Sequence, residues 1–124
     1  MNDILILDDD YDLAKSWEEV LTAAGGDVVI THSSKDAIEH IKQRKFRAVI
    51  LDLMIGAPLD GEPDSGIHFL RALREEDCAI PKLIGVSGYY GQDDGEMAKN
   101  LFNVYGVKHV LLKPFDPQEL VKLV

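Results

Sequence analysis

Five polar residues stand where short apolar runs of the sequence end: Asp8, Asp9, Asp52, Ser87 and Lys113. Three carboxylates gathered at one place repel each other and lose hydration, so such a group persists when a cation neutralises it. All-oxygen ligands favour a hard ion, and Mg²⁺, which keeps several waters, suits two carboxylates and a carbonyl. With an ammonium and a hydroxyl added, the set predicts a pocket for phosphoryl oxygens in which one carboxylate remains as nucleophile.

Each of these residues also has a purely structural interpretation. A lone Asp at a strand end is usually a turn former or a helix cap, and Asp10 fits such a cap. Lys113 precedes a proline and needs no partner other than water, and Ser87 followed by Gly88 fits simple turn chemistry. The functional interpretation depends on all five occurring together, at alternate segment ends.

The segments between these residues alternate between apolar runs and amphipathic stretches. Strands are expected at 4–7, 28–30, 48–51, 83–86 and 107–112. Helices are expected at 13–24, 67–73 and 97–105, and between a cap at Ser33 or Ser34 and Ile41. A last helix should follow an Asp116 cap, with Pro117 and Glu119 in its first turn. This alternation predicts a single α/β domain over residues 1–124, with a parallel sheet covered on both faces. Ligands of such sheets bind beyond the carboxyl ends of the strands, so the five residues should converge.

Composition narrows the functional classes. The chain has 124 residues and a net charge of −9, from 22 acidic and 13 basic residues. That field repels phosphate backbones, which disfavours direct binding of nucleic acid. Cys78 is the one cysteine, so no intramolecular disulfide can form. No apolar run approaches the ~20 residues of a membrane helix, and the acidic N-terminus is unlike a signal peptide; we expect a cytoplasmic protein that does not bind membranes.

From Ile4 to about Val121, the sequence resembles response-regulator receiver domains, which belong to the CheY-like superfamily. The matching pieces are Ile-Leu-Ile-Leu-Asp-Asp ending at Asp9, Val-Ile-Leu-Asp-Leu-Met around Asp52, the stretch Gly66–Arg74, Ile-Gly-Val-Ser-Gly from Ile84, and Lys-Pro-Phe-Asp-Pro-Gln-Glu-Leu from Lys113. The resemblance implies a flavodoxin-like (βα)5 doubly wound sheet with strand order 2-1-3-4-5. It also implies a two-component phosphorelay module rather than an enzyme, one that catalyses only its own phosphorylation and dephosphorylation.

The resemblance also implies a role for each acidic residue of the site. Asp52 is similar to the phosphoacceptor that takes a phosphoryl group from a phosphohistidine. Asp9 resembles the direct Mg²⁺ ligand, and Asp8 the residue that binds through water or shapes the site. Asp52 itself and the backbone carbonyl of Met54 would complete the protein ligands, and Mn²⁺ could replace Mg²⁺.

The remaining roles are implied in the same way. Ser87 takes the place of the hydroxyl residue that turns toward the phosphoryl group, and Lys113 pairs with a phosphoryl oxygen through a cis bond to Pro114. The implied partners are a sensor histidine kinase or phosphotransfer protein and a downstream protein or effector domain. The latter would bind the face of the fourth helix, fifth strand and last helix. A homodimer is a further expected assembly. The chain would be stand-alone or a piece of a larger regulator or hybrid kinase.

Two positions depart from the family pattern. Val110 stands three residues before Lys113, where the family usually carries an aromatic ring coupled to the hydroxyl residue; Tyr89, Tyr90 or Tyr105 are the candidates to replace it. Gly66 lies fourteen residues beyond Asp52, about six more than the family pattern, with Asp60, Glu62 and Asp64 in between. This 55–65 segment is either an acidic flap over the site or a tolerated insertion.

Two alternative functions remain open at this stage. A haloacid-dehalogenase-like phosphatase would use Asp8 as nucleophile in the Asp-x-Asp of residues 8–10, with Asp93-Asp94 as the late acidic motif. A degenerate receiver would be a phosphorylation-independent binding or dimerisation module, as Val110 and the long 55–65 segment suggest. The other singled-out residues are expected to be structural: surface positions for His32, His40, His68 and His109, packing positions for Trp17, Met97 and Phe102, and an incidental Cys78.

Overall fold

Strands and helices alternate along the chain, as the spacing of apolar residues predicts. The structure is a computed structural model that describes residues 3–53, 66–76, 80–88 and 96–124. Its elements are β1 (Asp3–Leu7), α1 (Tyr11–Ala23), β2 (Asp27–Thr31), α2 (Ser34–Gln43), β3 (Ala48–Asp52), α3 (Gly66–Glu75), β4 (Lys82–Gly88), α4 (Glu96–Val104), β5 (His109–Lys113) and α5 (Gln118–Leu123). Every expected strand and helix is confirmed, with ends that differ by one to a few residues.

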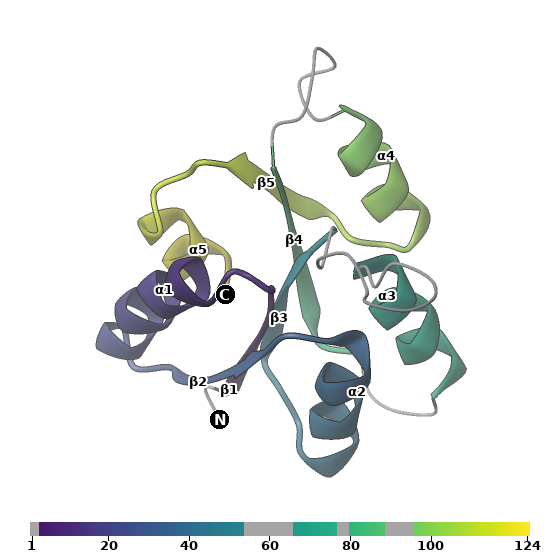
Figure 1. Cartoon of the computed structure of the whole chain (residues 1–124), viewed down its shortest axis with the longest axis horizontal. Helices are drawn as coiled ribbons and strands as arrows, with labels where there is room; N and C mark the ends of the chain where they lie inside the picture. The colour runs from purple at the N-terminus through teal and green to yellow at the C-terminus, as the bar shows by residue number, and fades with distance from the viewer. Residues whose placement is uncertain (1–2, 54–65, 77–79, 89–95) are drawn as a thin grey trace.

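The strands form one parallel sheet in the order β2-β1-β3-β4-β5. Helices α1 and α5 cover one face of this sheet, and α2, α3 and α4 lie on the other (Figure 1). The strand order reverses at β1 and β3, where Leu7 is paired with Leu51. The predicted flavodoxin-like, doubly wound fold is therefore confirmed, and its ligand-binding edge lies just beyond these two residues.

Two hydrophobic cores form because successive residues of a strand point to opposite faces. Leu5 and Leu7 of β1 pack into the core under α2, α3 and α4. Ile4 and Ile6 of the same strand pack into the core under α1 and α5. A strand buried on both faces therefore reads as an unbroken apolar run, as β1 and β3 do.

Local polar contacts determine where α1 and α2 begin and end. The side chain of Asp10 accepts a hydrogen bond from the backbone N–H of Leu13 at 3.1 Å and so caps α1. Ser33, rather than Ser34, caps α2 by accepting from the N–H of Asp36 at 3.2 Å. Gly25, with φ of 98°, follows the end of α1 in the left-handed region that favours glycine.

The fifth strand begins two residues later than predicted, at His109. The N–H of Val107 donates to the carbonyl of Phe102 at 3.0 Å, and Gly106 has φ of 80°, so this stretch closes α4. Placing His109 on a helix or loop surface was wrong, because this residue starts β5 and is half-buried.

The start of the last helix differs slightly from the predicted capping box. Asp116 does act at this helix end, because its carboxylate accepts from the N–H of Gln118 at 3.0 Å. Glu119, expected to reach back toward the cap, instead lies 3.6 Å from the ammonium of Lys122 one turn further on. Helix α5 therefore starts near Pro117, with one of the two predicted capping contacts.

Several smaller expectations can be compared with the structure. Trp17 and Phe102 are buried, as predicted, while His32 is exposed and His40 and His68 are half-buried on helices. Predictions about Met54, residues 55–65, Cys78, Tyr89, Tyr90, Asp93-Asp94 and the side chain of Met97 fall outside what the structure describes.

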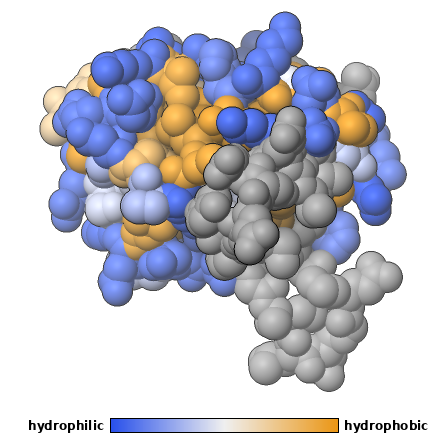
Figure 2. Space-filling view, turned by 90° about the horizontal axis from the view of Figure 1, so that it is seen from above, coloured by the Kyte–Doolittle hydropathy of each residue, from blue (hydrophilic) through white to orange (hydrophobic). Residues whose placement is uncertain are grey.

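The surface seen in Figure 2 is mainly hydrophilic, around a smaller hydrophobic area. Among the helices of the described residues, none has both the length and the apolar character to cross a bilayer.

Candidate functional site

Three carboxylates meet at the carboxyl edge of the sheet. Asp8 directly follows β1, and Asp52 is the last residue of β3, the neighbouring strand. Asp9 comes next in the turn that leads to α1. One carboxylate oxygen from each of the three lies within 4.8 Å of the other two. The structure therefore brings together the three acids that the sequence predicts.

Lys113, the last residue of β5, extends to the same place. Its ammonium donates to Oδ2 of Asp52 at 2.6 Å and to Oδ2 of Asp8 at 3.0 Å. The Lys113 side chain is 20% exposed, while Asp8 is 0% and Asp52 5% exposed. The ammonium is thus the counter-ion of two buried carboxylates, and the following bond to Pro114 is cis, as predicted.

The pKa of the Lys113 ammonium reflects this position. Burial acts to lower its pKa, but the hydrogen bond and charge of Asp52, followed by those of Asp8, outweigh burial, so the pKa is raised above its ordinary value. The ammonium also lies 5.7 Å from the ring centroid of Trp17, which stacks on Phe115 at 5.5 Å. Lys113 therefore stays charged, and its ammonium lies between the Trp17 ring and the carboxylates of Asp8 and Asp52.

Asp8 is anchored from several sides. Its Oδ1 accepts from the N–H of Asp10 at 2.9 Å, while its backbone N–H donates to the carbonyl of Thr31 at 3.1 Å. The backbone carbonyl of Asp8 accepts from Nδ1 of His32 at 2.9 Å when that nitrogen carries the proton. With Oδ2 bound to Lys113, both carboxylate oxygens of Asp8 already have a partner.

Sequence reasoning missed His32 and the contact between Trp17 and Lys113. His32 follows β2, whose carboxyl end reaches the same edge of the sheet, so strand position was the signal that could have found it. Trp17 was assigned to packing from its helical spacing alone, and no pattern in the sequence shows which core side chain lies beneath Lys113.

Helix α3 packs closely against the backbone of Asp52. The N–H of Gly66, its first residue, donates to the carbonyl of Leu53 at 3.0 Å. A Cβ at Gly66 would collide with the backbone carbonyl oxygen of Asp52 and lie 3.2 Å from its carbonyl carbon. Glycine is therefore required here by close approach, and α3 supports the backbone that carries the Asp52 carboxylate.

Ser87 also lies at this edge but makes a different contact. It is buried in β4, one residue beyond Val86, which is paired with Asp52. The hydroxyl of Ser87 donates to the carbonyl of Gly88 at 3.3 Å. The predicted hydroxyl residue is thus at this edge of the sheet, with its hydroxyl bound to its own strand.

Val110 and Tyr105 are near one another in the sequence but contact different parts of the structure. Val110 is half-buried in β5, paired with Gly85. The Tyr105 hydroxyl accepts from Nε of Arg71 at 3.2 Å, and the guanidinium of Arg74 lies 4.7 Å from the Tyr105 ring centroid. Tyr105 is therefore held against α3, in a position different from that of a ring at residue 110.

The charges and donors of the site fit a divalent cation. Asp8, Asp9 and Asp52 carry three negative charges against one positive charge on Lys113, which leaves an excess of two within this group. The donors are all carboxylate oxygens, the ligands that hard divalent ions prefer. The acidic group could therefore hold such an ion.

Comparison with protein families and curated proteins gives consistent results. The family model described as response regulator receiver domain matches residues 4–124. The chain is 27% identical over 118 residues to the transcriptional regulatory protein CrdR of Helicobacter pylori, with 94% of this chain and 50% of that protein covered. It is 28% identical over 121 residues to CpxR of Escherichia coli K12, with coverages of 98% and 47%. The chain thus spans about half the length of these relatives.

Solved structures show the same fold. A response regulator from Burkholderia pseudomallei, crystallised with a phosphorylated aspartic acid, a calcium ion and citrate, superposes with a TM-score of 0.80 at 19% identity. The match covers 99% of this chain and 66% of that one. At this identity the likeness concerns the fold alone.

Proposed function

Because the chain belongs to the family of response regulator receiver domains, we propose that its carboxylate Asp52 is the acceptor of a phosphoryl group. The observation that carries this assignment is the position of Asp52 at the end of β3, beside two further acids and 2.6 Å from the ammonium of Lys113. The donor would be the phosphohistidine of a histidine kinase or of a phosphotransfer protein.

The proposed reaction requires little covalent chemistry from the protein. An oxygen of Asp52 attacks phosphorus in line as the bond to the histidine nitrogen breaks, giving an acyl phosphate. Lys113 would move from Asp52 to an oxygen of the transferred group, while Asp8 keeps its ammonium nearby. Because the ammonium is already largely buried and held beside Asp52, a short movement brings it to the charge that develops.

We assign the metal to Mg²⁺, with Mn²⁺ as a substitute. Asp9 would bind it directly, Asp8 through water or by shaping the site, and Asp52 by its second oxygen. The carbonyl of Met54, outside the described residues, would complete the set. The ion would supply positive charge that, together with Lys113, stabilises the transferring group.

Signalling would follow from a change in population. The hydroxyl of Ser87 would leave the carbonyl of Gly88 for a phosphoryl oxygen and so bias the face of α4, β5 and α5 toward a downstream protein, effector domain or second copy. Val110 offers no ring to follow this movement, and Tyr105 is engaged by Arg71 and Arg74.

Two alternative functions, a phosphatase and a phosphorylation-independent binding module, can be weighed against the phosphoacceptor by the contacts of the site. Asp8 as the nucleophile of a phosphatase is disfavoured, because it is fully buried and both of its carboxylate oxygens are already hydrogen-bonded. A phosphorylation-independent binding module is motivated by Val110 and by the long 55–65 segment. The site that keeps Asp8, Asp9, Asp52 and Lys113 together counts against it.

The test is to label the chain with acetyl phosphate and Mg²⁺, then map the modified residue by mass spectrometry. We expect a mass increase of one phosphoryl group, carried on Asp52, lost in Asp52→Asn and lost with a chelator. Label on Asp8 would instead identify a phosphatase-like nucleophile. No label, with the fold retained, would favour the phosphorylation-independent module.

The remaining expectations stay predictions. They are the extent of one domain over residues 1–124, the homodimer, and the cytoplasmic location. The relatives CrdR and CpxR are named transcriptional regulatory proteins, and we propose a downstream regulatory output of that kind for this chain.

A further inference from the structure

Positive charge collects at the amino edge of the sheet, opposite the carboxylate site. Arg47 directly precedes β3, Lys82 begins β4 and Lys108 directly precedes β5. Since β3, β4 and β5 are adjacent strands spaced ~4.8 Å apart, these three cations form a row across the sheet edge. The backbone N–H of Lys82 donates to the carbonyl of Arg47 at 3.2 Å, which fixes the first two side by side.

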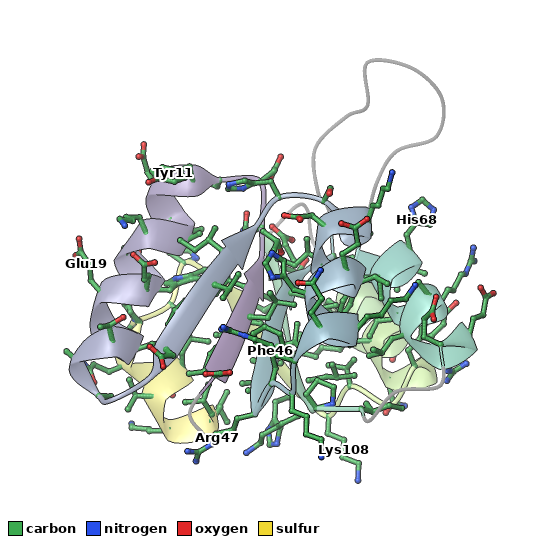
Figure 3. The ribbon with its side chains drawn as sticks, turned by 90° about the horizontal axis from the view of Figure 1, so that it is seen from below. Tyr11, Glu19, Phe46, Arg47, His68 and Lys108 are labelled. Atoms are coloured by element: carbon green, nitrogen blue, oxygen red, sulfur yellow. The ribbon has the colours of Figure 1, made fainter. Side chains whose placement is uncertain are left out.

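Figure 3 shows the side chains of Arg47 and Lys108 extending from this edge, with Tyr11 and His68 at the opposite one. The segment after α2 adds further cations beside the row. We call the whole set the basic edge: Lys42, Arg44, Lys45, Arg47, Lys82 and Lys108, all exposed. It holds six of the thirteen basic residues of a chain whose net charge is −9.

Internal ion pairs neutralise only part of the basic edge. Lys42 lies 3.1 Å from Glu76, and Nε of Arg44 lies 3.4 Å from Asp3. Across residues 3–53, 66–76, 80–88 and 96–124, no carboxylate pairs with Lys45, Lys82 or Lys108. Surface cations held close together without counter-ions favour an anionic partner.

Apolar hollows lie on both sides of a ridge within this edge. The ridge is Ile80 and Pro81, and Ile80 is 62% exposed. A cavity of about 320 Å³ lies between the ridge, Phe46 and the cations of residues 42–45. A second cavity, of about 340 Å³, lies between the ridge, Lys82 and Lys108. Each hollow therefore combines an apolar wall with a cationic rim.

We propose that the basic edge binds an acidic, extended segment of a partner protein. The side chains of an extended segment project to both sides of its backbone, so its carboxylates can reach the cationic rims while its apolar residues enter the hollows beside Ile80. The phosphate backbone of a nucleic acid would contact the cations but would not fill the apolar hollows. The net charge of −9 also disfavours binding of a long polyanion.

This surface is separate from the proposed phosphoacceptor. It lies at the amino ends of the strands, whereas Asp52 lies at their carboxyl ends. A segment bound here leaves Asp52 open to a phosphodonor, so it serves to dock or recruit a partner in either phosphorylation state.

The test uses fluorescence anisotropy of a labelled synthetic peptide in which Glu alternates with Leu, titrated with the full chain. We expect saturable binding that weakens ~10-fold in Lys82→Glu, because reversal of a rim charge creates a like-charge contact. Lys35→Glu on α2 makes the same change in net charge away from the basic edge and should bind nearly as the parent chain does. Unchanged urea midpoints of both variants would show that they are folded.

Three results would overturn the docking surface. The first is that the peptide does not bind. The second is that the two variants weaken binding equally, so that only net charge matters, and the third is that a single-stranded oligonucleotide of equal charge binds as tightly. Amide chemical shifts that change at Arg47, Lys82 and Lys108, rather than near Asp52, would support it independently.

Discussion

At the residue scale, the proposed site depends on one ammonium between two buried acids. The types and positions of Asp8, Asp9, Asp52 and Lys113 were predictable, because strand ends in a parallel sheet meet at one edge. The sequence did not reveal that Asp8 is fully buried while Asp9 is exposed, or that Lys113 bridges Asp8 and Asp52. Such details depend on side-chain packing, which residue spacing does not encode.

The raised pKa of Lys113 has a consequence for stability. A group whose pKa is higher in the folded state stabilises the fold fully below its unfolded pKa of ~10.4 and loses that contribution as pH rises through the folded value. We therefore expect the difference in free energy of unfolding between the parent chain and Lys113→Met to shrink above pH ~10.4. Urea unfolding in metal-free buffer measures it.

Lys35→Met serves as the control, because Lys35 is exposed and, among the described residues, no ion pair joins it to Asp8, Asp9 or Asp52. Its difference from the parent chain should not change over the same pH interval. If the gap between the parent chain and Lys113→Met stays constant, the ammonium is not the counter-ion that the structure indicates.

At the element scale, periodicity predicted which segments are strands and helices but not how closely they approach. The late start of β5 follows from the way Gly106 and Val107 close α4, a tertiary detail that apolar spacing could not show. Helix α4 lies directly against β4 because Gly85 has no side chain there. The ring of Phe102 occupies that space and is fully buried.

The contact between Gly85 and Phe102 can be tested with a double variant. A Cβ at Gly85 would lie 2.7 Å from the Phe102 ring, so Gly85→Ala should cost about 1–3 kcal/mol of unfolding free energy. Trimming the ring in Phe102→Leu leaves room for the added methyl. The double variant should therefore be more stable than the sum of the single effects predicts, whereas simple additivity would show that the two do not collide.

At the scale of the whole molecule, charge is divided between the two edges of one sheet. The acids gather at the carboxyl edge and six cations at the amino edge. The net charge of −9 indicated an acidic protein, but the basic edge became visible only when strand order placed Arg47, Lys82 and Lys108 in a row. Composition sums charges, whereas a surface depends on which strands are neighbours.

We expect the carboxyl edge to make the stability of the whole chain depend on a divalent ion. A ligand that binds only the folded state stabilises it by about 2.7 kcal/mol at a hundred times its dissociation constant. Mg²⁺ should therefore raise the free energy of unfolding of the parent chain. Asp12→Asn removes an exposed acid of α1 that is not a proposed ligand, and it should keep this gain.

The free energy of unfolding as a function of Mg²⁺ concentration is the most direct measurement of the central claim. We predict a saturable gain in the parent chain and in Asp12→Asn, and none in Asp9→Ala or Asp52→Asn. A parent chain indifferent to Mg²⁺, or an equal gain in Asp9→Ala, would contradict a divalent-ion site among Asp8, Asp9 and Asp52.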